Sequence, residues 1–390
     1  MSQELAYVVL TPYSLHKSRT GGILSRLISR TGLDLVAARM FAPSAQLVQQ
    51  YVESAAAING ASDAKIQRCL RDYILGKFSP DPHTGKRRRA MVLVFRGDDA
   101  VRKVRAVVGT LEANRRGGET IRDTYADLIE DASGQVQYFE PAVLAAVNSA
   151  GAAAELKLWA QYSDADGGLL ENVNTYAPGE QPERTLVLIK PDNFRFATGR
   201  PGNVIDFFSR TGLFIVAIKV HRMSVAEAME FYGPVREVLR TKLKDMVANK
   251  AKAAVEKELG LALSGEVVKQ LGELLGPVFG DNQFDNIVRF MSGRAPSECP
   301  ADELSQPGSE KCIALIYEGV GAIAKIRDVL GPTDPSKAPP GSIRREFGSS
   351  IMVNAAHASD APESVVREVG IVQPADNTFR REIEAFYAKA

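Results

Sequence analysis

The stretch Ser29-Arg-Thr-Gly-Leu-Asp-Leu-Val-Ala37 occurs a second time in the chain, slightly changed, as Ser209-Arg-Thr-Gly-Leu-Phe-Ile-Val-Ala217. The segments before it also match, since Glu4–Pro12 is similar to Glu183–Pro191, and the order of the matches is the same in both places. Similarity between distant segments in one order indicates that a structural unit is used twice. We therefore predict that the chain contains two copies of one fold.

The sequence between and within these copies sets their limits. Residues 164–182 are rich in Gly, Pro, Asn and Asp and show little periodicity, which predicts a linker. The linker separates a first half, residues 1–163, from a second half, residues 183–390. Residues 235–280, present only in the second half, carry an amphipathic pattern that predicts a helical insertion.

Each half shows the same succession of short apolar strands and helices. In the second half we predict strands near residues 185–189, 213–220, 312–317 and 350–355, with helices near 203–209 and 321–330. Four short strands with intervening helices favour an α+β fold. We expect two tandem ferredoxin-like domains, each a four-stranded antiparallel sheet covered by helices.

Composition excludes several classes of protein. The 390 residues contain 48 Lys and Arg against 47 Asp and Glu, so the net charge of +1 gives no general attraction to nucleic acids or membranes. We predict that the basic run Lys86–Arg89 is a solvated loop. Cys69, Cys299 and Cys312 lack the spacing of a disulfide framework or a zinc cluster. With no signal peptide or membrane span visible, we expect a cytoplasmic protein without membrane or nucleic-acid partners.

Among four histidines, His357 has the most informative surroundings. It follows the predicted strand at 350–355 and precedes a predicted helix, in which Asp360 and Glu363 form a capping-box pattern and Pro362 suits the first turn. A helix N-terminus favours phosphate, and neutral imidazole is a competent nucleophile near neutral pH. The alternative is a structural histidine whose hydrogen bonds are satisfied within the strand-to-helix junction.

Three cations could serve a phosphate-transferring histidine. Lys190 follows an apolar strand, Arg327 lies on a helix, and Arg344 ends a proline-rich loop. Phosphoryl transfer needs cations directed at the transferring and leaving oxygens. Taken singly, each of the three is more often a solvated surface charge.

Four motifs in one order extend this pattern: Lys190-Pro-Asp, Leu330-Gly-Pro-Thr-Asp-Pro, Pro340-Gly-Ser-Ile-Arg344 and Asn354-Ala-Ala-His-Ala-Ser-Asp360. Together they resemble the nucleoside diphosphate kinase family. The resemblance implies that the γ-phosphate of a nucleoside triphosphate passes to His357 and then to a nucleoside diphosphate, by a ping-pong mechanism. It also implies Mg²⁺ carried on the nucleotide phosphates, with no metal site on the protein itself.

The resemblance assigns roles to ten residues of the second half. His357 would be the phosphohistidine nucleophile, Glu368 would fix its tautomer, and Ser359 would support Glu368. Lys190, Asn354 and Tyr232 would lie near the ribose, the transferring phosphate and the histidine. The terminal phosphates and the base would be contacted by Arg327, Thr333, Arg344 and Phe284.

The sequence also departs from the family. Gln283 stands where an aromatic residue usually stacks on the base, so Phe284 would take that role through a local shift. Asn193 replaces a glycine-bearing turn, and the insertion enters the region that covers the nucleotide. An alternative function is therefore a non-catalytic nucleotide-binding or scaffolding protein.

The first half resembles the same fold without its chemistry. Thr11 replaces Lys190, Leu111 replaces Thr333, and we expect the segment Val136–Pro141 at the place of the histidine. Arg105 and Arg122 remain at the places of Arg327 and Arg344, so weak phosphate binding is conceivable there. Because the family forms dimers that assemble further, we expect an intrachain pseudo-dimer and larger homo-oligomers.

Overall fold

The computed structural model describes residues 3–54, 64–111 and 117–388. It divides into two compact units. The larger unit contains Met1–Val220, Ile313–Val369 and Gln373–Ala390, and the smaller contains His221–Cys312 and Gly370–Val372. These units do not correspond to the two halves predicted from the sequence repeat. The predicted boundaries, 1–163, 164–182 and 183–390, therefore stay a prediction.

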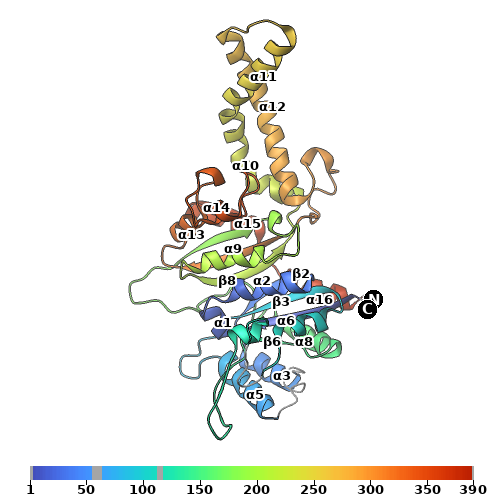
Figure 1. Ribbon diagram of the computed structural model, residues 1–390, viewed down its shortest axis with the longest axis vertical. Coiled ribbons are helices and arrows are strands. Elements are labelled where there is room, and N and C mark those ends of the chain that lie inside the picture. The colour runs from blue at the N-terminus through green and yellow to red at the C-terminus, as the bar shows by residue number, and fades with distance from the viewer. Residues whose placement is uncertain (1–2, 55–63, 112–116, 389–390) are drawn as a thin grey trace. The chain divides into compact units, whose positions relative to one another are not determined.

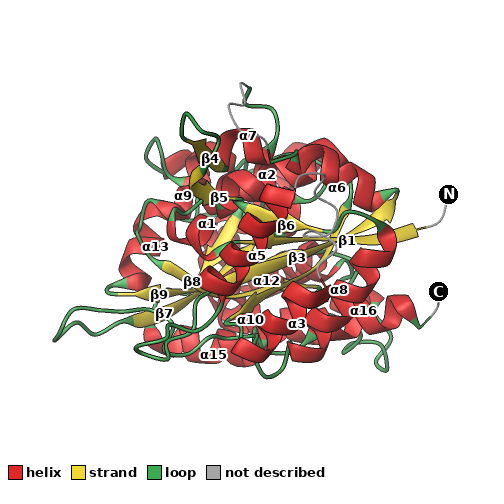
Figure 2. Ribbon diagram, turned by 90° about the horizontal axis from the view of Figure 1, so that it is seen from below, coloured by secondary structure: helices red, strands yellow, loops and turns green. Residues whose placement is uncertain are grey.

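The first half contains a four-stranded sheet with the order β2-β3-β1-β6. Neighbouring strands are antiparallel, with Val8 opposite Leu93 and Val9 opposite Leu144. Helices α6 and α8 both pack against β1 (Figure 2). The strands are β1 (Gln3–Leu10), β2 (Asp34–Phe41), β3 (Ala90–Asp98) and β6 (Val143–Ala145), and a separate hairpin is formed by β4 (Asp127–Glu130) and β5 (Val136–Glu140). The helices are α1 (Pro12–His16), α2 (Thr20–Thr31), α3 (Ala45–Ser54), α5 (Ala64–Phe78), α6 (Ala100–Val108), α7 (Ile121–Tyr125) and α8 (Ser149–Tyr162).

The second half contains a sheet with the order β10-β7-β9-β8, which is the order of the first sheet when strands are matched by their place in the chain. Its strands are β7 (Glu183–Ile189), β8 (Phe214–His221), β9 (Cys312–Gly319) and β10 (Ala356–Ala358). The helices of this half in or beside the larger unit are η1 (Pro191–Asn193), α9 (Arg200–Ser209), α13 (Ala322–Leu330), η3 (Pro335–Lys337), α14 (Ile343–Phe347), α15 (Pro362–Val372) and α16 (Thr378–Tyr387). Of these, α16 packs against α8 and β2 of the first half. The predicted α+β class and four-stranded antiparallel sheets are confirmed.

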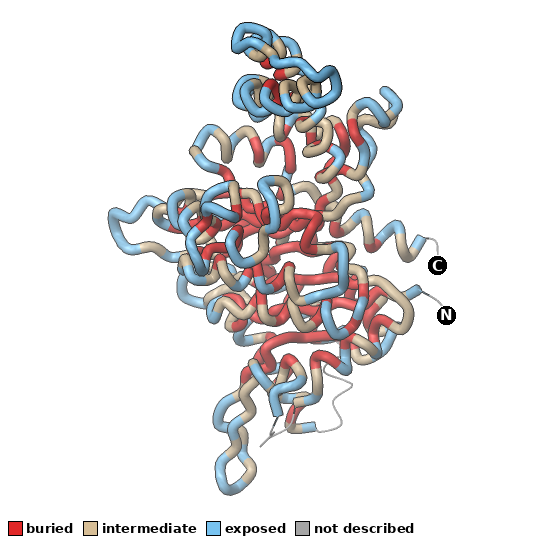
Figure 3. The backbone as a smooth tube through the Cα atoms, turned by 45° about the horizontal axis from the view of Figure 1, so that its top comes forward, coloured by how far each residue is buried: buried red, intermediate tan, exposed pale blue. Residues whose placement is uncertain are grey.

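The central strands are buried along nearly their whole length. Residues 186–189 of β7 and 8–10 of β1 have no exposed surface, and every residue of β9 is buried (Figure 3). A short, continuous apolar run is the sequence pattern of a strand covered on both faces, and these runs have that pattern. The strands therefore form the cores on which the candidate site is built.

Helices α2 and α9, one from each half, lie side by side in the larger unit (Figure 1). Two glycines meet at their crossing. A Cβ atom added to Gly21 would lie 2.5 Å from the carbonyl oxygen of Gly202, and one added to Gly202 would lie 2.3 Å from the carbonyl oxygen of Gly21. The close approach of the two helices therefore depends on both residues lacking a side chain.

The segment predicted as a linker is packed against both sheets. The amide of Gly168 donates to Met40 of β2 at 2.9 Å, and the amide of Leu170 donates to Val216 of β8 at 3.0 Å. The basic run Lys86–Arg89 is a loop with an exposed Arg87, as predicted, but three of its four residues are only partly exposed and its side chains also form contacts. Arg87 pairs with Asp166 at 2.9 Å. Arg89 donates to the carbonyl of Ile215 at 2.8 Å, and burial lowers the pKa of Arg89 to about 10.

The smaller unit is mainly helical and contains α10 (Val225–Lys242), α11 (Lys244–Leu259), α12 (Gly265–Ser292) and η2 (Pro296–Glu298). The residues predicted as an insertion, 235–280, lie within these helices. Gly260, in a left-handed conformation with φ of 65°, ends α11. Gly280 lets α12 approach α10, because a Cβ there would lie 2.6 Å from the backbone of Arg240. Arg240 also pairs with Asp281 at 2.7 Å and holds the pKa of that carboxyl well below its usual range.

Within the described residues, no helix is long and apolar enough to cross a membrane.

Candidate active site

His357 lies inside a strand, which corrects the prediction that it follows one. It is the middle residue of β10 and pairs with Leu188 of β7. The strand expected at 350–355 is a turn, in which the amide of Ser349 donates to the carbonyl of Val353 at 2.8 Å. Ala355 then adopts a left-handed conformation with φ of 71°, which prevents an extended strand before Ala356.

A hydrogen-bonded carboxylate orients the ring of His357. Nε2 of His357 lies 2.8 Å from Oε2 of Glu368, which comes from α15. The hydroxyl of Ser359 donates to the same oxygen at 2.7 Å. A carboxylate accepts from Nε2–H, so this contact favours the neutral tautomer whose lone pair is on Nδ1. The His357 side chain is 23% exposed, so a ligand can reach the ring.

The start of α15 differs in part from its prediction. Pro362 is the first residue of the helix, as expected, but the N-cap is Ala361 and no side chain caps it. Asp360 instead accepts a hydrogen bond from the Ser364 hydroxyl at 2.7 Å, which lowers the pKa of the Asp360 carboxyl. The predicted capping box is therefore wrong, because the extended Ala361 places Asp360 outside the N-cap position.

Lys190 is brought to the histidine strand by the end of β7. Its side chain is buried, and its ammonium group donates to Oδ1 of Asn354 at 3.0 Å and to the carbonyl of Met352 at 2.5 Å. The pKa of Lys190 is lowered to about 8, mainly by burial and also by the nearby Arg344, while Asp192 opposes the shift. The lysine is thus a desolvated cation close to the residues that precede His357.

Two arginines hold the backbone on either side of His357. Nη2 of Arg344 donates to the carbonyl of Ala356 at 3.2 Å, and Nη1 of Arg327 lies 3.4 Å from the carbonyl of Ala358. Arg344 also reaches Thr333, with 3.5 Å between Nη1 and Oγ1. The structure therefore gathers the predicted cations around the strand that carries the histidine.

Two of the predicted residues, Tyr232 and Phe284, lie in the smaller unit. Tyr232 is on α10, where its ring packs against that of Phe231 with centroids 5.0 Å apart. Phe284 is on α12 and only 2% exposed, and the guanidinium of Arg236 lies 5.4 Å from its ring centroid. Stacking of Phe284 on a base would require this side chain to be uncovered.

Two residues near the site carry contacts that the sequence analysis missed. Nδ2 of the buried Asn193 donates to the carbonyls of Lys190 at 3.0 Å and Ala355 at 2.7 Å, and so joins the ends of β7 and β10. Arg367 donates to Oε1 of Glu368 at 3.1 Å. The departure of Asn193 from a glycine-bearing turn was visible in the sequence, whereas the orientation of Arg367 had no sequence signal.

The first sheet shows which residue corresponds to the histidine. Leu144 of β6 pairs with Val9 of β1, as His357 pairs with the matching residue of β7. The expectation that Val136–Pro141 occupies this place is therefore wrong, because most of that segment forms β5 of the separate hairpin. Leucine has no group that could accept a phosphoryl group.

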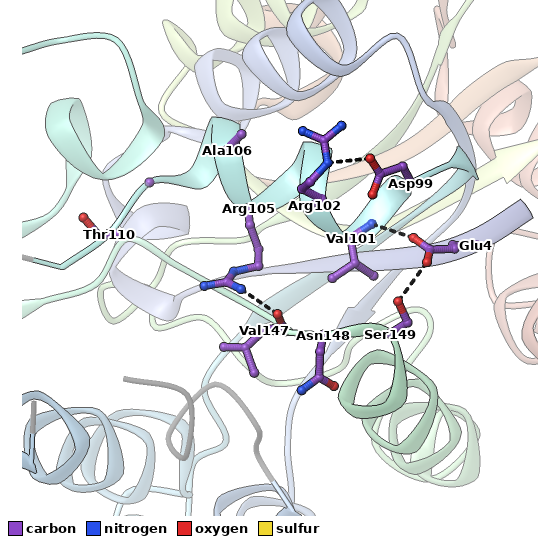
Figure 4. Close-up of a pocket in the computed structure, with 11 residues that line it drawn as sticks. Glu4, Asp99, Val101, Arg102, Arg105, Ala106, Thr110, Val147, Asn148 and Ser149 are labelled. Atoms are coloured by element: carbon purple, nitrogen blue, oxygen red, sulfur yellow. Dashed lines mark hydrogen bonds and ion pairs between the residues drawn. The ribbon is translucent and has the colours of Figure 1, made fainter. Parts of the chain in front are cut away.

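The first half also contains a cavity of about 430 Å³ near Arg105 (Figure 4). Nη1 of Arg105 donates to the carbonyl of Val147 at 2.6 Å. The carboxylate of Glu4 accepts from the amide of Val101 at 3.3 Å and from the hydroxyl of Ser149 at 2.8 Å. A carboxylate thus already occupies the N-terminal ends of α6 and α8, where an anion would otherwise be favoured.

Comparisons with known proteins concern the second half. The family model described as nucleoside diphosphate kinase matches residues 183–294 and 302–378. A curated nucleoside diphosphate kinase of Polynucleobacter necessarius is 33% identical over 199 residues, which cover 51% of this chain and 98% of that protein. The protein of the same name from Staphylothermus marinus is 32% identical over 190 residues, covering 49% of this chain and 92% of the relative.

A solved structure of the Aquifex aeolicus nucleoside diphosphate kinase is 28% identical to the chain. The match covers 49% of this chain and 95% of that one, with a TM-score of 0.32. The sequence relatives, whose lengths are almost fully covered, and the family model agree with the residues gathered around His357. This chain belongs to the nucleoside diphosphate kinase family of enzymes.

Proposed function

We propose that the chain is a nucleoside diphosphate kinase that acts by a ping-pong mechanism through phosphohistidine at His357. The observation that supports this most directly is the contact of 2.8 Å between Nε2 of His357 and Glu368. A carboxylate that holds Nε2–H directs the lone pair of the neutral ring to Nδ1, the atom that would attack phosphorus.

Both half-reactions balance without any further reactant. In the first, Nδ1 forms a bond to the γ-phosphorus, the bond from phosphorus to the bridging oxygen breaks, and a nucleoside diphosphate leaves. In the second, a terminal oxygen of the acceptor diphosphate attacks the same phosphorus, and the electron pair of the nitrogen–phosphorus bond returns to Nδ1. Lys190, Arg327 and Arg344 would stabilise the negative charge on the transferring and leaving oxygens.

The other site residues would bind and orient the nucleotide. Asn354, which accepts from Lys190 at 3.0 Å, would contact the ribose or the transferring phosphate together with that lysine. Thr333 would help Arg327 and Arg344 with the terminal phosphates, and Ser359 would support Glu368. The proposed roles of Tyr232 near the histidine and of Phe284 against the base rest on the family resemblance.

Magnesium would enter as part of the nucleotide. Among the described residues, no cluster of three or more His, Cys, Asp or Glu could hold a metal ion. The cations Lys190, Arg327 and Arg344 near the His357 strand fit phosphate oxygens better than a metal ion. Mg²⁺ bound to the phosphates would neutralise those oxygens that the protein does not contact.

We also propose that the first half is a degenerate copy that serves as a covalent dimer partner. The matching strand orders and the glycine contact between α2 and α9 support this proposal. Larger homo-oligomers of such pairs are expected from the family resemblance. Light scattering would test them, and a particle with the mass of one chain, 42.3 kDa, would contradict the larger assembly.

The activity can be tested by following a labelled γ-phosphate. Wild-type protein, His357→Ala and the control His16→Ala, which alters an exposed histidine of the first half, would be incubated with γ-labelled ATP and Mg²⁺ and then given GDP. Wild type and His16→Ala should carry acid-labile, base-stable label and release labelled GTP, and His357→Ala should do neither. Nucleotide binding by wild type without label or GTP would favour the non-catalytic alternative.

A further inference from the structure

The buried carboxylate of Glu368 receives donors on both of its oxygens. Oε2 accepts from Nε2 of His357 at 2.8 Å and from the hydroxyl of Ser359 at 2.7 Å. Oε1 accepts from Nη2 of Arg367 at 3.1 Å. Only the arginine among these three donors is permanently charged. Since the Glu368 side chain is only 5% exposed, its carboxylate depends on these donors in place of water.

The first half keeps this carboxylate and changes its donors. Counting from the paired strand residues Leu144 and His357, Glu155 on α8 stands at the place of Glu368 on α15, and the two helices begin at the same spacing. In the first half, Leu144, Ala146 and Ala154 take the places of His357, Ser359 and Arg367.

The carboxylate of Glu155 includes the hydroxyl of Tyr7 among its donors. Glu155 has no exposed surface. With Ala154 at the place of Arg367, the arginine is present only in the half whose carboxylate also binds a histidine.

We propose that Arg367 is a positioning residue that keeps Glu368 ionised and directs its Oε2 to His357. By binding Oε1, Arg367 leaves Oε2 to the histidine and the serine. By supplying positive charge beside the carboxylate, it opposes the uptake of a further proton by the His357–Glu368 pair. This inference rests on the proposed phosphohistidine mechanism, because a protonated ring has no lone pair for attack.

Other charges around the histidine belong to several elements and stay unchanged when Arg367 is altered. Asp360 precedes α15 and interacts with both His357 and Arg327 of α13. Lys190 follows β7, and Arg344 on α14 binds the carbonyl next to the histidine. These other charges are the same in wild type and in an Arg367 variant. A difference between the two in the pH dependence of phosphohistidine formation would therefore come from the Arg367 charge.

The test compares Arg367→Gln, which removes the charge, with Arg367→Lys, which keeps it. Arg102→Gln is the control, since Arg102 pairs with the nearby Asp99 in the first half and is far more exposed. The rate of phosphohistidine formation from labelled ATP would be measured between about pH 5.5 and 9. For Arg367→Gln the acid limb should move to higher pH, so the loss of rate should be several-fold larger at the acid end of this range than at its alkaline end.

The two other variants complete the test. Arg367→Lys should return the acid limb to within about 0.3 pH units of wild type, and Arg102→Gln should match wild type. An Arg367→Gln profile with the wild-type acid limb would overturn the inference while leaving the kinase proposal intact. A uniform loss at every pH that lysine does not rescue would show a merely structural role. Absence of label on the wild-type protein would refute the mechanism and this inference together.

Discussion

Arg122 in the first half and Arg344 in the second half make the same two hydrogen bonds in surroundings that differ chemically. Nη1 of each arginine donates to the glycine carbonyl after the preceding helix, at 2.9 and 3.1 Å respectively. Nη2 of each donates to the carbonyl of the first residue of the last sheet strand, β6 or β10, at 3.1 and 3.2 Å respectively. Since the first half has no histidine in that strand, these bonds belong to the fold. Arg344 therefore serves both the fold and the proposed phosphate contact.

The two halves differ most at the end of their first strand. In the second half this position is Lys190, a cation. In the first half it is Thr11, whose hydroxyl donates at 3.1 Å to the buried carboxylate of Glu140, which Tyr73 also binds at 2.6 Å. Burial raises the pKa of Glu140. The first half thus has a carboxyl group beside the position where the second half has the ammonium cation of Lys190. This arrangement is unfavourable for binding a phosphate.

Exchanging this one residue should have the largest effect. Lys190→Thr gives the second half the residue of the first, and removes a buried cation from the proposed phosphate site. We expect kcat/KM for phosphate transfer to fall about 10²- to 10³-fold, the usual effect of losing one donor to transition-state charge. The control Thr11→Ser should leave activity unchanged. A loss of less than about threefold for Lys190→Thr would show that the cation has no role in transfer.

The joint between the halves offers the next test. Gly21→Ala places a methyl group within 2.5 Å of the Gly202 backbone, so α2 and α9 must move apart. We expect the free energy of unfolding to fall by about 1–3 kcal/mol, measured by denaturant titration. Gly76→Ala is the matched control, because nothing lies within 4 Å of a Cβ atom there, and it should stabilise α5 by about 0.5–1 kcal/mol. Equal effects of the two changes would mean that the helices are not closely packed in solution.

The parts of the fold that the sequence predicted were those governed by local pattern. The apolar runs located the central strands to within about two residues. The repeat in the sequence correctly implied that both sheets would have the same strand order, because equivalent strands carry equivalent side-chain patterns.

The errors lay where tertiary contacts override local pattern. Ala355 has a left-handed backbone that few alanines adopt, so the sequence suggested a strand in front of His357 instead of around it. The hydrogen bonds of Arg87 and Arg89 were not predicted, because their partners, such as Asp166, are distant in the chain. Leu144 was overlooked because the β4–β5 hairpin has no counterpart in the second half to align with.

The lysine that distinguishes the halves should also be visible in the pH dependence. Burial lowers the pKa of Lys190 to about 8, and a lysine carries its charge only below its pKa. The value of kcat/KM, which reports on the free enzyme, should therefore fall above about pH 8 and be about tenfold below its plateau near pH 9. Lys190→Arg should be less active but keep its charge, so its alkaline limb should disappear. An unchanged alkaline limb in that variant would assign the limb to another group.

The smallest effect is expected from giving the first half a histidine. In the double variant His357→Ala with Leu144→His, the new ring would lie beside Glu155, whose carboxylate already accepts from Tyr7. It would also lack a cation at the position of Thr11. A histidine without an available orienting carboxylate or a phosphate-binding lysine has neither a fixed tautomer nor a stabilised leaving group. We expect label from γ-labelled ATP to stay at the level of His357→Ala, whereas clear labelling would show that the nucleophile alone separates the two halves.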